Sequence, residues 1–224
     1  MQRHEVINSL SGGKYHTYLE IGVEAGVTFN QVNIPAKVAV DPDFKIEVKN
    51  LSGKAFPITS DAYFDLHDEK FDCVFIDGLH LYEQSTKDFI NAWQRLNPGG
   101  VVLIDDCYPS DEIAAMRDHG KARQLKSDRG DPDRNWMGDV YKTVVWINDC
   151  TDYAYAFVKD TMGIVAVWQE TVKDRPRWMT SEAEIADCDY VTFCGFSLPK
   201  MTVDQIARRI RGAPPARKWF GFKV

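Results

Sequence analysis

Two short apolar segments of the chain are each followed at once by acidic residues. Asp77 follows the segment 71–76, and Asp105 and Asp106 follow the segment 100–104. If both segments are parallel strands of one sheet, their carboxyl ends bring the three carboxylates to the same edge. Like charges held close together are unfavourable, so the pattern predicts a bound hard cation such as Mg²⁺, with these three residues as its ligands. Protonation of the carboxylates, or pairing with lysine or arginine, would also relieve the repulsion.

A histidine lies three residues beyond the first of these carboxylates. Histidine titrates near neutral pH, so His80 could accept a proton from a substrate hydroxyl group. It could instead bind the loop and hold Asp77 in position. Asp77 and His80 are therefore the candidate catalytic residues.

A loop with two glycines follows another apolar segment and has the sequence EIGVEAG at residues 20–26. Gly22 and Gly26 would let the backbone approach a ligand at the end of a strand, where the next helix offers free N–H groups. The dinucleotide pattern G-x-G-x-x-G would need a glycine where this chain has Glu24, whose charge would repel a pyrophosphate. Taken alone, the loop indicates either a ligand-binding loop or a tight strand–helix turn.

A further acidic residue ends the segment VAVD. Asp41 could accept hydrogen bonds from both hydroxyls of a ribose, or it could cap the turn before Pro42. Together with the glycine loop, this carboxylate favours nucleoside binding. Ser60 and Asp61 follow a weaker strand candidate, and they could bind an adenine edge or begin a helix as N-caps.

The elements that must position these residues alternate between apolar strands and helices, which indicates a parallel sheet covered on both faces. After residue 106 the pattern predicts a short helix at 110–119, a long loop at 121–137 and an amphipathic helix at 203–210. Two late strands, at 140–147 and 162–168, should form an antiparallel edge, with 154–159 extending one of them. The earlier strands are expected at 18–22, 37–40, 55–59, 71–76 and 100–104, and the earlier helices at 27–33 and 82–96.

Composition limits the class of protein. The chain has 224 residues, of which 44% are hydrophobic, so we expect one α/β domain at 1–170 with an extension at 171–224 packed on it. The net charge of −6 argues against a nucleic-acid partner. We see neither a signal peptide nor an apolar run long enough to cross a membrane. The cysteines are five in number and include no C-x-x-C pair, which favours the cytoplasm. The sequence does not determine the oligomeric state, and it is compatible with a homo-oligomer.

Four segments carry a resemblance to a known family. LEIGVEAG, VAVDP, FDCVFIDGLHLYEQSTKDF and LNPGGVVLIDD, in this order over residues 15–108, resemble the class I S-adenosylmethionine-dependent methyltransferases. The chain is most similar to the methyltransferase 24 branch, which is related to catechol-type and macrolide-sugar O-methyltransferases. The resemblance implies an α/β fold with a Rossmann-like, doubly wound sheet of seven strands, mostly parallel with an antiparallel last strand. It also implies S-adenosylmethionine as methyl donor.

The resemblance also implies roles for single residues. Metal-dependent members hold Mg²⁺ through acidic residues at the positions of Asp77, Asp105 and Asp106, and they use a lysine as base where this chain has His80. The segment 136–142 is similar to a GDV-[WY]-K stretch of related sequences, to which we assign no role. The residues expected to bind the cofactor are Glu20, Gly22 and Gly26 in the loop, Asp41 at the ribose, Ser60 and Asp61 near the adenine, and Asp77.

These observations predict methyl transfer to a hydroxyl group of a small molecule, with His80 as the proton acceptor and Mg²⁺ as an optional aid. Two alternatives are a nicotinamide-dependent oxidoreductase and a non-catalytic module that binds a nucleoside or, through its basic tail, a partner. The tail carries Arg208, Arg209, Arg211, Arg217 and Lys218.

Overall fold

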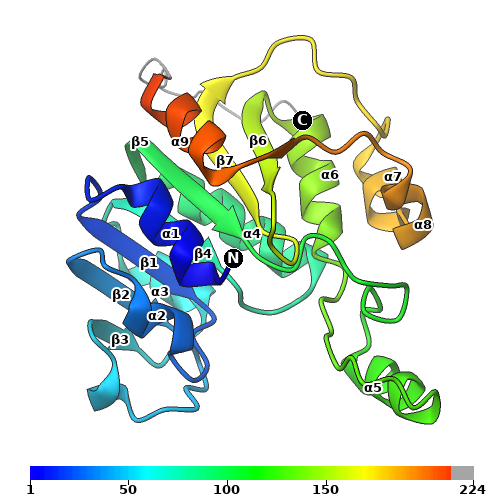
Figure 1. Ribbon diagram of the computed structural model, residues 1–224, viewed down its shortest axis with the longest axis horizontal. Helices are drawn as coiled ribbons and strands as arrows, with labels where there is room; N and C mark the ends of the chain where they lie inside the picture. The colour runs from blue at the N-terminus through cyan, green and yellow to red at the C-terminus, as the bar shows by residue number, and fades with distance from the viewer. Residues whose placement is uncertain (213–224) are drawn as a thin grey trace.

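The computed structural model describes residues 1–212, in which eight strands form one sheet in the order β3-β2-β1-β4-β5-β7-β6-β8 (Figure 1). The first five strands of this order are parallel, whereas β7 runs antiparallel to both of its neighbours. The strands are β1 (Thr17–Ile21), β2 (Ala36–Val40), β3 (Lys54–Phe56), β4 (Phe71–Ile76), β5 (Leu96–Ile104), β6 (Tyr153–Val158), β7 (Val165–Thr171) and β8 (Lys200–Met201).

The predicted Rossmann-like sheet, mostly parallel with an antiparallel strand, is confirmed, but the predicted number of seven strands is corrected to eight. The additional strand is β8, which pairs in parallel with β6. It is only two residues long, and two residues are too few to show the period-2 alternation by which a strand is recognised in a sequence.

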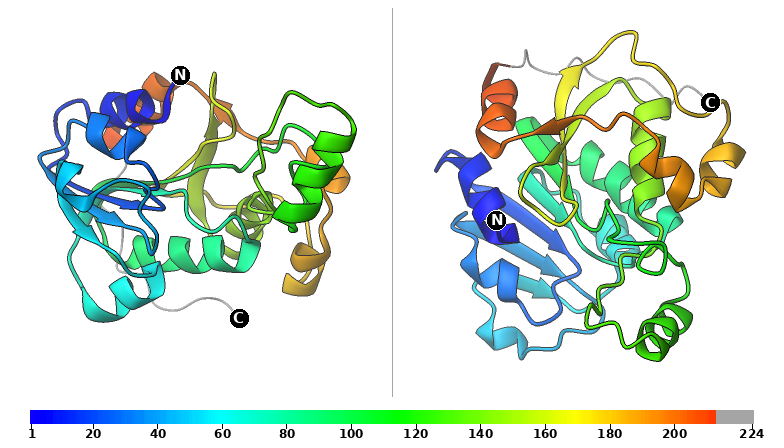
Figure 2. Two further views of the ribbon diagram at one scale, coloured as in Figure 1. Left: turned by 90° about the horizontal axis from the view of Figure 1, so that it is seen from below. Right: turned by 45° about the vertical axis from the view of Figure 1, so that its right-hand side comes forward.

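Helices cover both faces of the sheet (Figure 2). One face carries α1 (Arg3–Ser11), α2 (Val27–Gln31) and α9 (Val203–Gly212), and the other carries α3 (Ser60–Leu66), α4 (Tyr82–Gln94) and α6 (Tyr141–Cys150). Two short helices, α7 (Glu182–Asp187) and α8 (Tyr190–Cys194), lie against α6, and a 3₁₀ turn spans Val48–Asn50. The helix α5 (His119–Asp128) projects away from the sheet together with its flanking loops (Figure 1).

The long helices form where apolar side chains recur at helical spacing. The helix α4 buries Phe89 and Ala92 against the sheet, and the predicted amphipathic helix at 203–210 is α9, which buries Ile206 and Ile210. Arg208, Arg209 and Arg211 belong to α9, whereas Arg217 and Lys218 lie outside the described residues. In residues 1–212 no helix combines the length and apolar character needed to cross a membrane.

Three local predictions were wrong in the segment that follows β5. The predicted strand at 140–147 is the helix α6, the predicted helix at 110–119 is a series of turns, and the predicted loop at 121–137 contains most of α5. Residues 141–149 are buried on every side of α6. A helix buried on all sides has a short continuous apolar run, and periodicity alone does not distinguish such a run from a buried strand.

Candidate active site

The strand register places several of the predicted site residues in one row. Ile21 of β1 stands opposite Val40 of β2 and Ile76 of β4, and Ile76 stands opposite Ile104 of β5. The residues that follow these four are Gly22, Asp41, Asp77 and Asp105, so they leave the sheet at the same level. The expectation that the carboxylates meet at one sheet edge is therefore confirmed.

Gly22 lies where the chain leaving β1 packs against the chain leaving β4. A Cβ atom at this position would lie 2.0 Å from the backbone oxygen of Asp77, and the φ angle of Gly22 is +79°. Both facts require glycine, because no side chain fits against a backbone carbonyl at that distance. The loop then passes through Glu24, whose φ is also positive at 48°, to Gly26, the N-cap of α2. The loop therefore presents backbone at the carboxyl end of β1.

The Asp41 side chain holds this loop in shape. Its Oδ2 atom accepts hydrogen bonds from the backbone amides of Val23 and Glu24, each at 2.8 Å, and its Oδ1 atom accepts one from Asp43 at 2.7 Å. A carboxylate has about four acceptor positions, so Oδ1 retains capacity for a hydroxyl donor. The residue is thus both a turn-forming group and a candidate ribose ligand.

Glu20 lies behind the loop. Its side chain is buried and accepts a hydrogen bond from the Tyr18 hydroxyl at 2.5 Å. Burial raises the pKa of Glu20 to about 8, so the group is mostly protonated at neutral pH. This carboxyl group supports the loop from within the core.

Ser60 and Asp61 begin α3 beside α4. The Asp61 carboxylate pairs with Lys87 at 2.7 Å, and Gln84 donates to both Asp61 and Ser60. Both side chains therefore lie against α4. The N-cap of α3 is Thr59, whose hydroxyl accepts from Ala62.

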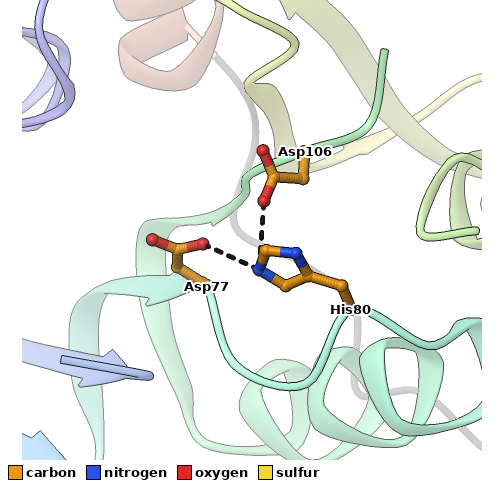
Figure 3. A group of neighbouring side chains, drawn as sticks. All are labelled: Asp77, His80 and Asp106. Carbon is orange, nitrogen blue, oxygen red and sulfur yellow. Dashed lines mark ion pairs between the residues drawn. The ribbon is translucent and has the colours of Figure 1, made fainter. Parts of the chain in front are cut away.

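His80 lies between two of the carboxylates (Figure 3). Its Nε2 atom lies 3.1 Å from Asp106 Oδ2 and 3.5 Å from Asp77 Oδ1, and its Nδ1 atom lies 3.1 Å from the backbone oxygen of Trp136. A carbonyl oxygen only accepts, so Nδ1 carries a proton, and Nε2 faces two negative groups. Burial lowers the pKa of His80, but Asp77 and Asp106 outweigh this effect and raise it above its ordinary value. The resting form is therefore the imidazolium.

An arginine from the start of the chain lies on the other side of the cluster. The Nε atom of Arg3 donates to Asp105 Oδ2, and its Nη2 atom lies 3.4 Å from Asp77 Oδ2. Asp105 is buried, and burial together with neighbouring negative charge raises the pKa of its carboxyl group and of that of Asp106. Sequence reasoning missed Arg3, because nothing in the local sequence connects α1 with the ends of β4 and β5.

The segment 136–142, which had no assigned role, supports the His80 loop. A Cβ atom on Gly138 would lie 1.9 Å from the backbone oxygen of His80. The next residue, Asp139, is buried and accepts from the backbone amide of Tyr82 at 2.8 Å, which fixes the start of α4. Its other oxygen accepts from Arg117 at 2.5 Å and lies 3.4 Å from Lys142. These contacts hold the loop of His80 against the segment 136–142.

We expect the Asp139→Ala variant to lose about 3–5 kcal/mol of unfolding free energy, because the Tyr82 amide loses its acceptor and the buried ammonium of Lys142, which still donates to Ala186, loses its carboxylate partner. Urea unfolding followed by circular dichroism measures this loss. Glu83→Ala is the matched control, since Glu83 pairs with the same Arg117 but is exposed, and its removal should cost less than about 1 kcal/mol. Equal losses in the two variants would contradict the role of Asp139.

Trp136 connects the His80 loop to a cavity. Its indole ring stacks on the His80 ring at a centroid distance of 5.0 Å and on the His119 ring at 4.6 Å. The cavity has a volume of about 190 Å³, and its lining includes Trp136, His119, Arg123 and Arg134. Within residues 1–212 neither arginine forms an ion pair. The cavity and the imidazole of His80 therefore share one aromatic wall.

Comparison with known proteins finds a family match over part of the chain and solved structures of similar fold. Residues 37–107 match a family model described as Methyltransferase domain, and no curated protein matches the chain. A candidate caffeoyl-CoA O-methyltransferase from Staphylococcus aureus superposes with a TM-score of 0.54 at 17% identity, over 75% of this chain and 83% of that one. An SAH-bound methyltransferase from Podospora anserina superposes with a TM-score of 0.52 at 15% identity, over 73% and 75% of the chains. At these identities the likeness establishes the fold.

The family match spans Asp41, the loop of Asp77 and His80, and the pair Asp105 and Asp106. It does not favour the alternatives, a nicotinamide-dependent oxidoreductase or a non-catalytic module. Residues 37–107 are therefore similar to a methyltransferase domain, and the likeness to the two solved methyltransferase structures shows a shared fold.

Proposed function

We propose that the protein transfers the methyl group of S-adenosylmethionine to a hydroxyl group of a small molecule. The observation that carries the proposal is the position of His80 beside the glycine loop. Gly22 touches the backbone of Asp77, and the Asp77 side chain touches the imidazole of His80. This contact supports the proposal, because the glycine loop that would bind the nucleoside and the imidazole that would accept the proton are neighbours on one sheet edge.

For the cofactor, we propose that the backbone from Gly22 to Gly26 lies against the methionine part and that Asp41 accepts hydrogen bonds from the ribose hydroxyls. Asp77 lies between the loop and His80 and would face the same part of the cofactor. The side chains of Ser60 and Asp61 already bind Gln84 and Lys87 of α4. We therefore propose that the first turn of α3, rather than these two side chains alone, would approach the adenine. Glu20 would act indirectly, by supporting the loop.

When bound, S-adenosylmethionine supplies a methyl group on a positively charged sulfur, which an oxygen nucleophile can attack. His80 would first release its Nε2 proton to solvent and would then accept the hydroxyl proton of the methyl acceptor at Nε2. The carbonyl of Trp136 keeps the second ring proton on Nδ1 and so fixes the orientation of the ring. The remaining contribution of the protein is to hold the two reactants in line, which is the larger effect in reactions of this type.

We further propose that the acceptor lies on the side of His80 that carries Trp136. The cavity lined by Trp136 and His119 is large enough for part of a small molecule, and the indole of Trp136 in its wall stacks on the imidazole of His80. Oxygen is the preferred acceptor atom because a histidine between carboxylates suits the removal of a hydroxyl proton. We also infer a cytoplasmic location, which the unpaired state of all five cysteines supports.

Whether the carboxylate cluster fits Mg²⁺ depends on which of its oxygens are free. One ligand atom each from Asp77, His80 and Asp106 lies within 4.8 Å of the others, the usual spacing of a metal-binding group. However, Nε2 of His80 faces Asp77 and Asp106, and Arg3 binds Asp77 and Asp105. Mg²⁺ needs about six oxygen ligands at about 2.1 Å, so the cluster in this arrangement does not fit the ion. The predicted Mg²⁺ site stays a prediction, and we route no step through it.

Calorimetric titration with S-adenosylhomocysteine tests the proposed cofactor site. We expect micromolar binding by the wild type and a Kd at least about tenfold higher for Asp41→Asn, because the amide replaces a charged acceptor of up to three backbone hydrogen bonds. An NADH titration serves as the control for the oxidoreductase alternative. Binding of NADH in place of S-adenosylhomocysteine by folded protein would contradict the proposal.

A further inference from the structure

A single arginine is bound to two of the three carboxylates that end β4 and β5. Arg3 donates through Nε to Asp105, and its Nη2 atom approaches Asp77. We propose that Arg3 is the resident cation of this cluster, so that the carboxylates are held together by the protein itself and no divalent metal ion binds among them.

Each carboxylate of the cluster has a basic side chain beside it without an added ion. Arg3 contacts Asp77 and Asp105, and the imidazole of His80 lies against Asp77 and Asp106. Arg3 keeps its proton at all physiological pH values, and its pKa is raised further by the neighbouring carboxylates despite the opposing effect of burial. The repulsion from which a metal ion was predicted is therefore relieved by the protein's own side chains.

The helix α1 holds Arg3 in position. Val6, Ile7 and Leu10 of this helix are buried against the sheet and α9, and a capping box between Gln2 and Glu5 begins it. A cation in the first turn of a helix is disfavoured by the helix dipole, so Arg3 needs acidic partners at this position. The planar guanidinium presents Nε and Nη2 in a fixed fork, which suits two carboxylates that face one another.

The guanidinium also opposes a metal ion directly. It uses Oδ2 of Asp105 and approaches Oδ2 of Asp77, two of the oxygens that a Mg²⁺ ion would need. A divalent ion among the same carboxylates would lie close to the positive charge of Arg3, and repulsion at such distances is strong where the surroundings are buried. Metal binding would therefore require Arg3 to leave the cluster.

Mn²⁺ binding, measured by electron paramagnetic resonance on the full chain, tests this inference without any acceptor or methyl donor. We expect no saturable Mn²⁺ binding by the wild type at metal concentrations used for Mg²⁺ enzymes. Arg3→Ala should gain a saturable Mn²⁺ site, with an affinity at least about tenfold higher than any weak Mn²⁺ binding by the wild type. The substitution frees the carboxylate oxygens and removes the positive charge that repels the metal ion. Arg3→Lys should gain little, since it retains the charge.

Two further variants make the result decisive. Arg209→Ala removes an arginine that is also ion-paired and about equally exposed, 47% against 45% for Arg3, and it should leave Mn²⁺ binding as in the wild type. Arg3→Ala combined with Asp105→Asn should lose the gained site, which would place the metal in the cluster. Circular dichroism verifies that each variant is folded.

Saturable Mn²⁺ binding by the wild type, lost in Asp105→Asn, would overturn the inference and support the Mg²⁺ prediction. Absence of binding by folded Arg3→Ala would overturn it as well, because Arg3 would then not be what keeps a metal out. Since no step uses the cofactor, either result is independent of whether the proposed methyl transfer is correct.

Discussion

The Gly22→Ala variant should lose S-adenosylhomocysteine binding and about 3 kcal/mol or more of unfolding free energy. The added Cβ atom would lie 2.0 Å from the backbone oxygen of Asp77, so the ends of β1 and β4 would have to separate. Separation moves the glycine loop away from Asp77, so the proposed cofactor site would be disrupted. Urea unfolding gives the stability change, and calorimetric titration with S-adenosylhomocysteine gives the affinity.

Gly99→Ala is the matched control for the backbone conformation. Gly99 has the same φ of +79°, but a Cβ atom there would have no neighbour within 4 Å. Its substitution should cost only the roughly 1–2 kcal/mol of a left-handed alanine and should leave ligand affinity unchanged. Similar effects of the two substitutions would show that the close approach of Gly22 to Asp77 is not what shapes the cofactor site.

The His80→Gln variant should reduce kcat by about 10²–10⁴-fold while S-adenosylhomocysteine affinity changes little. Glutamine preserves a polar side chain of similar length but does not accept a proton. The measurement is the initial rate of S-adenosylhomocysteine release, with the first acceptor that a panel of phenols and sugars yields for the wild type. His16→Gln is the control, since His16 is exposed and precedes β1 at the opposite edge of the sheet.

The pH dependence of kcat distinguishes a base from a group that only holds Asp77 in position. Only the unprotonated ring accepts a proton, and the pKa of His80 is raised by Asp77 and Asp106. The wild-type kcat should therefore still rise with pH above the ordinary histidine pKa of about 6.5. Asp106→Asn removes one charge that stabilises the imidazolium, so the rise should move to lower pH. A profile that does not respond to this substitution would assign His80 a positioning role.

Much of the sheet edge could be predicted from the sequence. The segments that became β1, β2, β4 and β5 are short apolar runs, each followed by a glycine or an aspartate, and parallel strands end together. That rule needs only local sequence information, because each strand and the residue that follows it are adjacent in the chain. It was enough to place Gly22, Asp41, Asp77 and Asp105 in one row.

The identity of α6 depended on its surroundings. Its β-branched and aromatic residues favour a strand locally, but they are buried on all sides between α4, α7 and α8. Packing from every direction stabilises a helix there whatever its local preference. The periodicity of a segment carries no information about which helices from other parts of the chain pack against it.

The sequence by itself determined which residues lie at the sheet edge, and the tertiary structure decided which positively charged side chains pair with their carboxylates. The carboxylates of Asp77, Asp105 and Asp106 indicated that positive charge must be near, but not its source. Arg3 reaches them only because α1 packs on the sheet, and His80 is oriented by Trp136 and Gly138, more than fifty residues further along the chain. Electrostatic pairing acts through space, so a partner distant in sequence leaves no mark in the local pattern.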